Sequence, residues 1–180
     1  FAHIMSGSNH RPYTYPAGRI PIPNDAKSRA GGVMYSDYAL GGFLDAASCE
    51  PWCVNTVFVI TAAHCASSAG KTEIPLEKYH IPAMIYAHAF VTPGSVGKTA
   101  SLIDLMPTLF SLLGMDYDSW FYGRDILADD FRERAFVATY QDLGYLEGDR
   151  FTVLSPVDRA ELFLLRPTDD APYAQARPEA

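Results

Sequence analysis

The chain has 180 residues, of which 48% are hydrophobic and 13% aromatic, and it carries a formal net charge of −7. This composition supplies enough apolar side chains for a folded core and excludes extended disorder away from the chain ends. The negative charge and the lack of a basic stripe exclude nucleic acid as the main partner. No apolar run approaches the roughly 20 residues that a membrane-spanning helix needs.

The first 47 residues predict a strand, a long loop and a helix. Residues 1–5 are expected to form a short buried strand. The prolines and glycines that follow disfavour helices and strands up to about Asp25. This predicts a loop long enough to carry functional residues. In residues 28–47 apolar side chains recur at helical spacing, which predicts an amphipathic helix despite the glycines within it.

Two apolar strands are expected in the middle of the chain. Residues 55–62 form a continuous β-branched run, which predicts a central strand of a parallel sheet with both faces covered. Because ligands of open α/β sheets bind beyond the carboxyl ends of strands, the following loop, residues 63–78, is expected to lie over a site. Residues 82–87 predict a second strand.

The C-terminal half predicts a helix, a small sheet and a tail. Residues 102–113 are apolar at a helical period that ends at Gly114, a C-cap position. Short apolar runs beyond Arg134 predict a small antiparallel sheet, with strands in residues 135–140, 151–154 and 162–165. Residues 1–166 are therefore expected to form the folded part, and residues 167–180 a disordered tail.

One histidine, His64, ends the apolar run VFVITAAHC at residues 57–65 and has two interpretations. The segment fits the pattern around the general-base histidine of trypsin-like proteases. That class also needs a nucleophilic serine in a Gly-Asp-Ser-Gly-Gly segment, which is missing, so a protease is disfavoured. The other interpretation is a metal ligand, because a neutral imidazole binds divalent metals well.

The three cysteines leave the redox state open. Cys49 could pair with Cys53 or with Cys65, and three free thiols fit the sequence equally well.

Several segments in a characteristic order resemble the sulfatase and phosphoglycerol transferase family of the alkaline phosphatase superfamily. The segments that resemble the C-terminal half of that family are YHIPAMIYA (79–87), TPG (92–94), SLIDLMPTLFSLLG (101–114) and YGRDIL (122–127). Upstream, SNHRPY (8–13) and YSDYA (35–39) resemble its lipoteichoic acid synthase-like branch. The resemblance implies an α/β fold, the C-terminal portion of an alkaline-phosphatase-like sandwich with a small antiparallel sheet near the C-terminus.

At the expected metal site the sequence of this chain differs from that of the family it resembles. Relatives end this strand in Ala-Asp-His, where the aspartate and the histidine bind the catalytic metal, whereas this chain has Ala63 before His64. Divalent ions in phosphoryl-transfer sites prefer hard oxygen ligands, so manganese, magnesium or zinc is expected to bind here only weakly. The family's threonine nucleophile is expected to lie before Phe1, so the chain looks like a fragment.

The resemblance assigns metal binding to His64 and substrate binding to His10 and His80, with no catalytic nucleophile within the chain. For His80 two roles stay open, a second metal ligand or a proton donor to the leaving group. Asp104 is interpreted as a helix-start or structural carboxylate.

The function that the resemblance implies is metal-dependent phosphoglycerol (phosphodiester) transfer from a phospholipid headgroup to a glycan or lipid acceptor, impaired by Ala63. The full-length protein is expected to be membrane-anchored at the extracytoplasmic (periplasmic) face of a bacterial cell membrane. Two alternatives remain: a sulfatase or phosphoesterase of the same superfamily, and a non-catalytic binding or vestigial domain.

Overall fold

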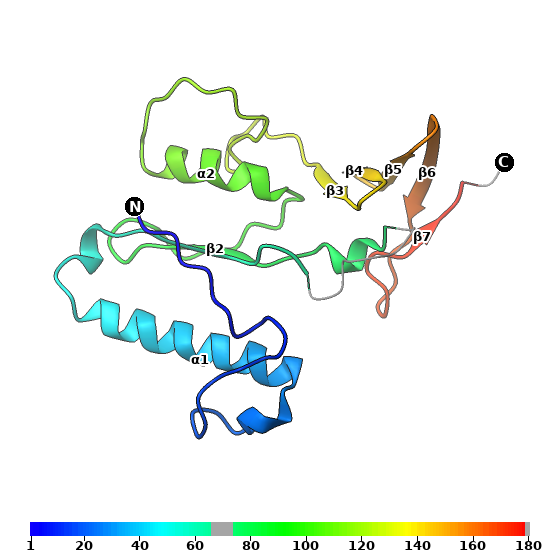
Figure 1. Cartoon of the computed structure of the whole chain (residues 1–180). Helices are drawn as coiled ribbons and strands as arrows, with labels where there is room; N and C mark the ends of the chain where they lie inside the picture. The colour runs from blue at the N-terminus through cyan, green and yellow to red at the C-terminus, as the bar shows by residue number, and fades with distance from the viewer. Residues whose placement is uncertain (66–73, 179–180) are drawn as a thin grey trace. The chain divides into compact units, whose positions relative to one another are not determined.

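The computed structural model describes residues 1–65 and 74–178, and part of the expected site loop, residues 66–73, lies outside the described residues. The chain divides into two compact units. Unit 1 comprises Phe1–Val57 with Ala87–Ala89, and unit 2 comprises Phe58–Tyr86 with Phe90–Ala180. The chain contains helices and strands, as expected for an α/β fold, and its C-terminal part is a run of consecutive strands (Figure 1).

Unit 1 is built around the helix α1, Arg29–Ser48, preceded by the short 3-10 helix η1, Asn24–Ala26, and followed by η2, Cys53–Asn55. The Ser28 hydroxyl accepts a hydrogen bond from the Gly31 backbone N–H at 3.1 Å, which caps the first turn and sets where the helix begins. The predicted helix is therefore confirmed. The strand predicted for residues 1–5 is wrong, because this segment is exposed and no strand is described in unit 1 with which it could pair.

The buried face of α1 differs from the predicted one. Its buried residues are Gly31, Gly32 and Ala47, whereas Val33 and Phe43 are exposed. The cause lies in the N-terminal loop, which packs tyrosine side chains against the helix: a β-carbon at Gly31 would lie 2.1 Å from the Tyr15 hydroxyl. Gly31 and Gly32, which by propensity weaken the helix, thus permit the loop to pack on it.

In unit 2 the strands β1, Phe58–Thr61, and β2, Ala83–Tyr86, form a two-stranded antiparallel sheet. Both strands were predicted, but the expectation that β1 has parallel neighbours is wrong for the pairing described. An apolar β-branched run does not by itself distinguish parallel from antiparallel pairing. The antiparallel register brings the C-terminal end of β1 beside the N-terminal start of β2, with Thr61 opposite Ala83.

The predicted helix at residues 102–113 is present as the 3-10 turn η4, Leu102–Asp104, continued by α2, Leu105–Leu112. It ends at Gly114, which has a positive φ of 61°. The Met115 N–H donates to the Phe110 carbonyl at 3.0 Å and the Gly114 N–H to the Ser111 carbonyl at 2.9 Å, the pattern of a Schellman C-cap.

We expect Gly114→Ala to lower the free energy of unfolding by about 1 kcal/mol, because a β-carbon is strained in the left-handed conformation. Urea unfolding of the intact protein measures the change. Gly94→Ala is the matched control, since its backbone φ is not positive and a β-carbon there would meet no atom within 4 Å. Equal stability of the two variants would contradict the assignment of a glycine-dependent cap.

The C-terminal part of unit 2 is a five-stranded antiparallel sheet in chain order, coloured yellow to red in Figure 1. Its strands are β3 (Ala135–Ala138), β4 (Leu143–Glu147), β5 (Arg150–Ser155), β6 (Arg159–Leu165) and β7 (Gln175–Ala176). The predicted small antiparallel sheet is confirmed, and β4 and β7 are additional to the prediction. Part of the segment expected to be a disordered tail is thereby ordered, because β7 pairs with β6.

The core of unit 2 lies on this sheet. Phe151 is fully buried, and the buried residues around it are Ile74, Leu76, Leu146 and Val153. The short 3-10 helix η3, Leu76–Lys78, contributes to the same cluster and leads directly to β2. The core thus fixes the segment that carries His80. Among the described residues, no helix has both the length and the apolar character of a membrane span.

Candidate active site

The ends of β1 and β2 bring two of the predicted site histidines into one region of unit 2. His64 follows the end of β1 and His80 precedes the start of β2. Beyond the strands, the Ala62 N–H donates to the Pro82 carbonyl at 3.4 Å, and the Cys65 thiol donates to the His80 carbonyl at 3.1 Å. The two segments therefore run side by side as far as the histidines.

His64 is exposed, and its ring orientation is defined by a local hydrogen bond. Nδ1 lies 2.8 Å from the backbone carbonyl of Cys65. A carbonyl oxygen can only accept, so Nδ1 carries the proton and Nε2 of the neutral ring keeps a lone pair. Histidines that bind metals commonly donate their second ring nitrogen to a carbonyl in this way. The His64 side chain is thus in the tautomer that binds a metal through Nε2.

The donor atoms around His64 nevertheless do not fit a divalent metal site. Ala63, which is exposed beside it, offers no ligand atom. Within residues 1–65 and 74–178, no three His, Cys, Asp or Glu side chains gather in an arrangement that could hold a metal ion. One imidazole alone leaves a hard cation without the oxygen ligands that it prefers.

His80 is also exposed, and its ring contacts an aromatic side chain from the C-terminal part of the chain. Nδ1 lies 2.8 Å from the hydroxyl oxygen of Tyr173, and the two rings meet edge to face with centroids 5.6 Å apart. Tyr173 falls in the segment that the sequence predicted to be disordered, so this partner was missed. No sequence pattern links two residues that lie 93 positions apart.

His10 belongs to unit 1, in the tyrosine-rich loop before α1. Its backbone N–H donates to the Gly7 carbonyl at 3.1 Å, and its carbonyl accepts from the Tyr13 N–H at 2.6 Å. These turns leave its side chain exposed. Because His10 lies in the other unit, its role as a substrate-binding residue beside His64 and His80 stays a prediction.

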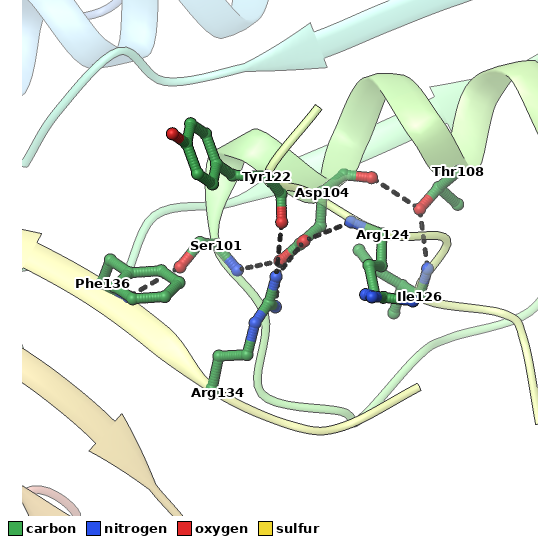
Figure 2. A network of polar contacts seen from close by, with 8 residues as sticks. All are labelled: Ser101, Asp104, Thr108, Tyr122, Arg124, Ile126, Arg134 and Phe136. Atoms are coloured by element: carbon green, nitrogen blue, oxygen red, sulfur yellow. Dashed lines mark hydrogen bonds and ion pairs between the residues drawn. The ribbon is translucent and has the colours of Figure 1, made fainter. Parts of the chain in front are cut away.

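Asp104 is the centre of a buried polar network rather than a site residue (Figure 2). Its carboxylate, which is fully buried, accepts two hydrogen bonds of 2.8 Å from the Arg134 guanidinium. It also accepts from the backbone N–H groups of Ser101 at 2.9 Å and Arg124 at 2.8 Å. The interpretation of Asp104 as a helix-start carboxylate is confirmed.

The electrostatics of Asp104 follow from these contacts. Burial acts to raise the pKa of its carboxyl, but the hydrogen bonds from Arg134 and from the Ser101 and Arg124 backbones outweigh burial and lower that pKa below its ordinary value. The same pairing raises the pKa of Arg134. Both groups are therefore charged in the folded protein.

The network ties the segment 122–127 to the N-terminal turns of the helix. The Thr108 hydroxyl donates to the Asp104 carbonyl at 2.7 Å and accepts from the Ile126 N–H at 2.9 Å, as Figure 2 shows. The Ser101 hydroxyl accepts from the Phe136 N–H at 2.7 Å, which connects β3 to the same turn. The motifs at 101–114 and 122–127 are thus adjacent in space because the Arg124 and Ile126 N–H groups donate to the Asp104 carboxylate and the Thr108 hydroxyl.

All three cysteines are free thiols, with Cys53 buried and Cys49 exposed. The two disulfide pairings that the sequence left open are not formed.

The chain is similar to known proteins both in sequence and in structure. Residues 1–115 match the sulfatase family. A crystal structure of a protein in the alkaline phosphatase superfamily from Vibrio parahaemolyticus is similar to this chain, with a TM-score of 0.87 and 34% sequence identity over 97% of this chain. The match covers 43% of that protein, so this chain spans less than half of its length.

Proposed function

The chain belongs to the sulfatase family, and we propose that it is part of a phosphodiester transferase that acts on a phospholipid headgroup. The observation that carries the proposal is the arrangement of β1 and β2, which sets His64 and His80 at one end of a strand pair. Exposed imidazoles can interact with the anionic oxygens of a phosphate or sulfate ester.

Each histidine has its own place in the proposal. His64, with a lone pair on Nε2, is the residue suited to a metal. His80 and His10 bind the anionic group that is transferred. The threonine nucleophile is supplied by a part of the longer protein outside this chain, and a glycan or lipid hydroxyl is the acceptor.

The proposed setting is the extracytoplasmic, periplasmic side of a bacterial membrane, where the lipid headgroup is accessible. The longer protein is held there by a membrane anchor. The net charge of −7 is unfavourable for nucleic acid as a substrate or partner.

Metal dependence in this chain is proposed to be weak. Manganese, magnesium or zinc would have His64 as a ligand but no carboxylate at position 63. The same observation supports a second candidate, a non-catalytic or vestigial member of the family. A sulfatase or phosphoesterase activity is a further alternative, because sulfate and phosphate esters present similar tetrahedral anions.

We expect Ala63→Asp in the intact protein to raise the affinity for manganese by at least about tenfold and to raise phosphodiester turnover with it. The reason is that the carboxylate adds a charged oxygen ligand next to His64. Calorimetric titration with manganese and turnover of a phosphatidylglycerol substrate measure the two effects.

The matched control is Ala63→Asn, which has the same shape without the charge and should gain much less affinity. A gain in neither affinity nor turnover for Ala63→Asp would count against a metal site at His64. A gain in affinity without turnover would favour the non-catalytic candidate.

A further inference from the structure

The contact between Tyr173 and His80 involves one proton whose position matters for the chemistry of the ring. The neutral imidazole has one N–H and one lone pair, whereas a tyrosine hydroxyl can donate or accept. At 2.8 Å the hydroxyl and Nδ1 share a hydrogen bond, and the direction of that bond decides which ring nitrogen of His80 carries the proton.

Tyr173 is held in place from several directions. β7 pairs with β6, with Gln175 opposite Leu165. The Gln175 side chain donates to the Ile74 carbonyl at 3.0 Å, which joins the C-terminal segment to the segment before η3. The Tyr173 ring packs against the hydrophobic core of unit 2. The hydroxyl is therefore presented to His80 by the folded sheet.

The backbone of His80 is fixed by the same sheet. Tyr79 packs against the same core and donates its hydroxyl to the Ala138 carbonyl at 3.2 Å. Burial raises the pKa of Tyr79, so this hydroxyl stays protonated as a donor. The Cys65 thiol donates to the His80 carbonyl at 3.1 Å. Both partners of the Tyr173 contact are thus positioned in advance of any ligand.

We propose that Tyr173 is a positioning residue that keeps neutral His80 in the tautomer with its proton on Nε2, so that His80 donates a hydrogen bond to an anionic ester oxygen and does not bind a metal. An imidazole nitrogen is a much stronger base than a phenol oxygen, so the tyrosine hydroxyl donates and Nδ1 accepts. The remaining proton of the ring then lies on Nε2. The nature of the anion rests on the proposed function, whereas the tautomer does not.

The two histidines at the strand ends consequently have opposite tautomers. The Cys65 carbonyl places the proton of His64 on Nδ1, and the Tyr173 hydroxyl places that of His80 on Nε2. His64 has a lone pair on Nε2 whereas His80 has an N–H there, so His80 is the ring whose Nε2 can donate a hydrogen bond to an anion. This disfavours the metal-ligand role that the sequence left open for His80, whereas proton donation to a leaving group stays a prediction.

The test is the ring nitrogen spectrum of His80 in the intact protein labelled with ¹⁵N-histidine, recorded above the pH at which the ring is neutral. The signals are assigned by their loss in His80→Gln. We expect one tautomer, protonated at Nε2, in the native protein and a mixture of both tautomers in Tyr173→Phe, which keeps the ring but removes the hydroxyl. Tyr140→Phe, at a tyrosine that is 95% exposed, is the matched control and should leave the spectrum unchanged.

A native His80 protonated at Nδ1, or an unchanged tautomer in Tyr173→Phe, would overturn the proposal. Added inorganic phosphate should shift the Nε2 signal in the native protein and shift it less in Tyr173→Phe. An equal shift in both would also count against the proposal.

Turnover separates the positioning role of Tyr173 from the proposed function. Tyr173→Phe should lower kcat by about fivefold, the loss expected for one oriented hydrogen bond. A changed tautomer in a protein with no esterase or transferase activity would refute the proposed function and leave the positioning role standing.

Discussion

Replacing Asp104 with alanine is expected to lower the free energy of unfolding by about 3–5 kcal/mol, the cost of removing one partner from a buried ion pair. The Arg134 side chain is only 10% exposed and would lose both of its 2.8 Å bonds to the carboxylate. The backbone N–H groups of Ser101 and Arg124 would lose their acceptor as well. Urea unfolding of the intact protein measures the loss.

The matched control is a second carboxylate paired with arginine in the same unit. Glu161 accepts from Arg177 at 2.8 Å, but the arginine side chain is 73% exposed. Solvent screens such a pair, so Glu161→Ala should cost less than about 1 kcal/mol. Similar losses in the two variants would show that the Asp104 network does not stabilise the fold through its burial.

The same carboxylate makes stability depend on pH in the acidic range. Because the folded-state pKa of Asp104 is lowered, its contribution is fully present above the unfolded-state pKa of about 3.9 and is lost as the pH falls from there toward the folded-state pKa. Asp104→Asn removes this titration, so its unfolding free energy should fall less steeply below about pH 4 than that of the native protein. Parallel curves would contradict the lowered pKa.

Replacing Gly123 with alanine is expected to lower the free energy of unfolding by about 2–3 kcal/mol through overpacking. A β-carbon at this position would lie 1.9 Å from the Ile103 carbonyl oxygen and 3.0 Å from the Asp104 nitrogen. These are backbone atoms of the turn that leads into α2, so they cannot give way as a flexible side chain would. The substitution should therefore push the segment 122–127 away from the buried carboxylate.

Thermal or urea unfolding of the intact protein measures this effect, with Gly97→Ala as the control. A β-carbon at Gly97 would meet no atom within 4 Å, so that change should stay within about 0.5 kcal/mol. If Gly123→Ala is as stable as the native protein, the close packing of residues 103 and 123 is not present in solution.

The elements that could be predicted from the sequence are those with local signals. Ser28 caps α1 and Gly114 ends the helix of residues 102–112, and both positions are readable from side-chain chemistry alone. β5 and β6 are apolar runs bounded by turn residues. β4 was not predicted because Gly144 interrupts its pattern, yet Gly144 is required there since a β-carbon would lie 2.7 Å from the Phe151 ring.

The features that could not be predicted depend on contacts between distant residues. The buried face of α1 is set by tyrosines from the preceding loop, so helical periodicity pointed to the wrong side. The antiparallel pairing of β1 could not be predicted, because a β-branched run is compatible with either strand direction. At the candidate site, the position of His64 after a strand was readable, but its tautomer depends on where the Cys65 carbonyl points.

The link between residues 80 and 173 has a consequence for biosynthesis. Tyr173 is the 93rd residue that the ribosome adds after His80, and Gln175, the partner of Ile74, comes 101 residues after Ile74. Contacts this far apart in the chain form late, because the loop between them must first close. In a nascent polypeptide halted before residue 173 the His80 ring would lack the hydroxyl that orients it, so the site is not assembled until β7 has left the exit tunnel.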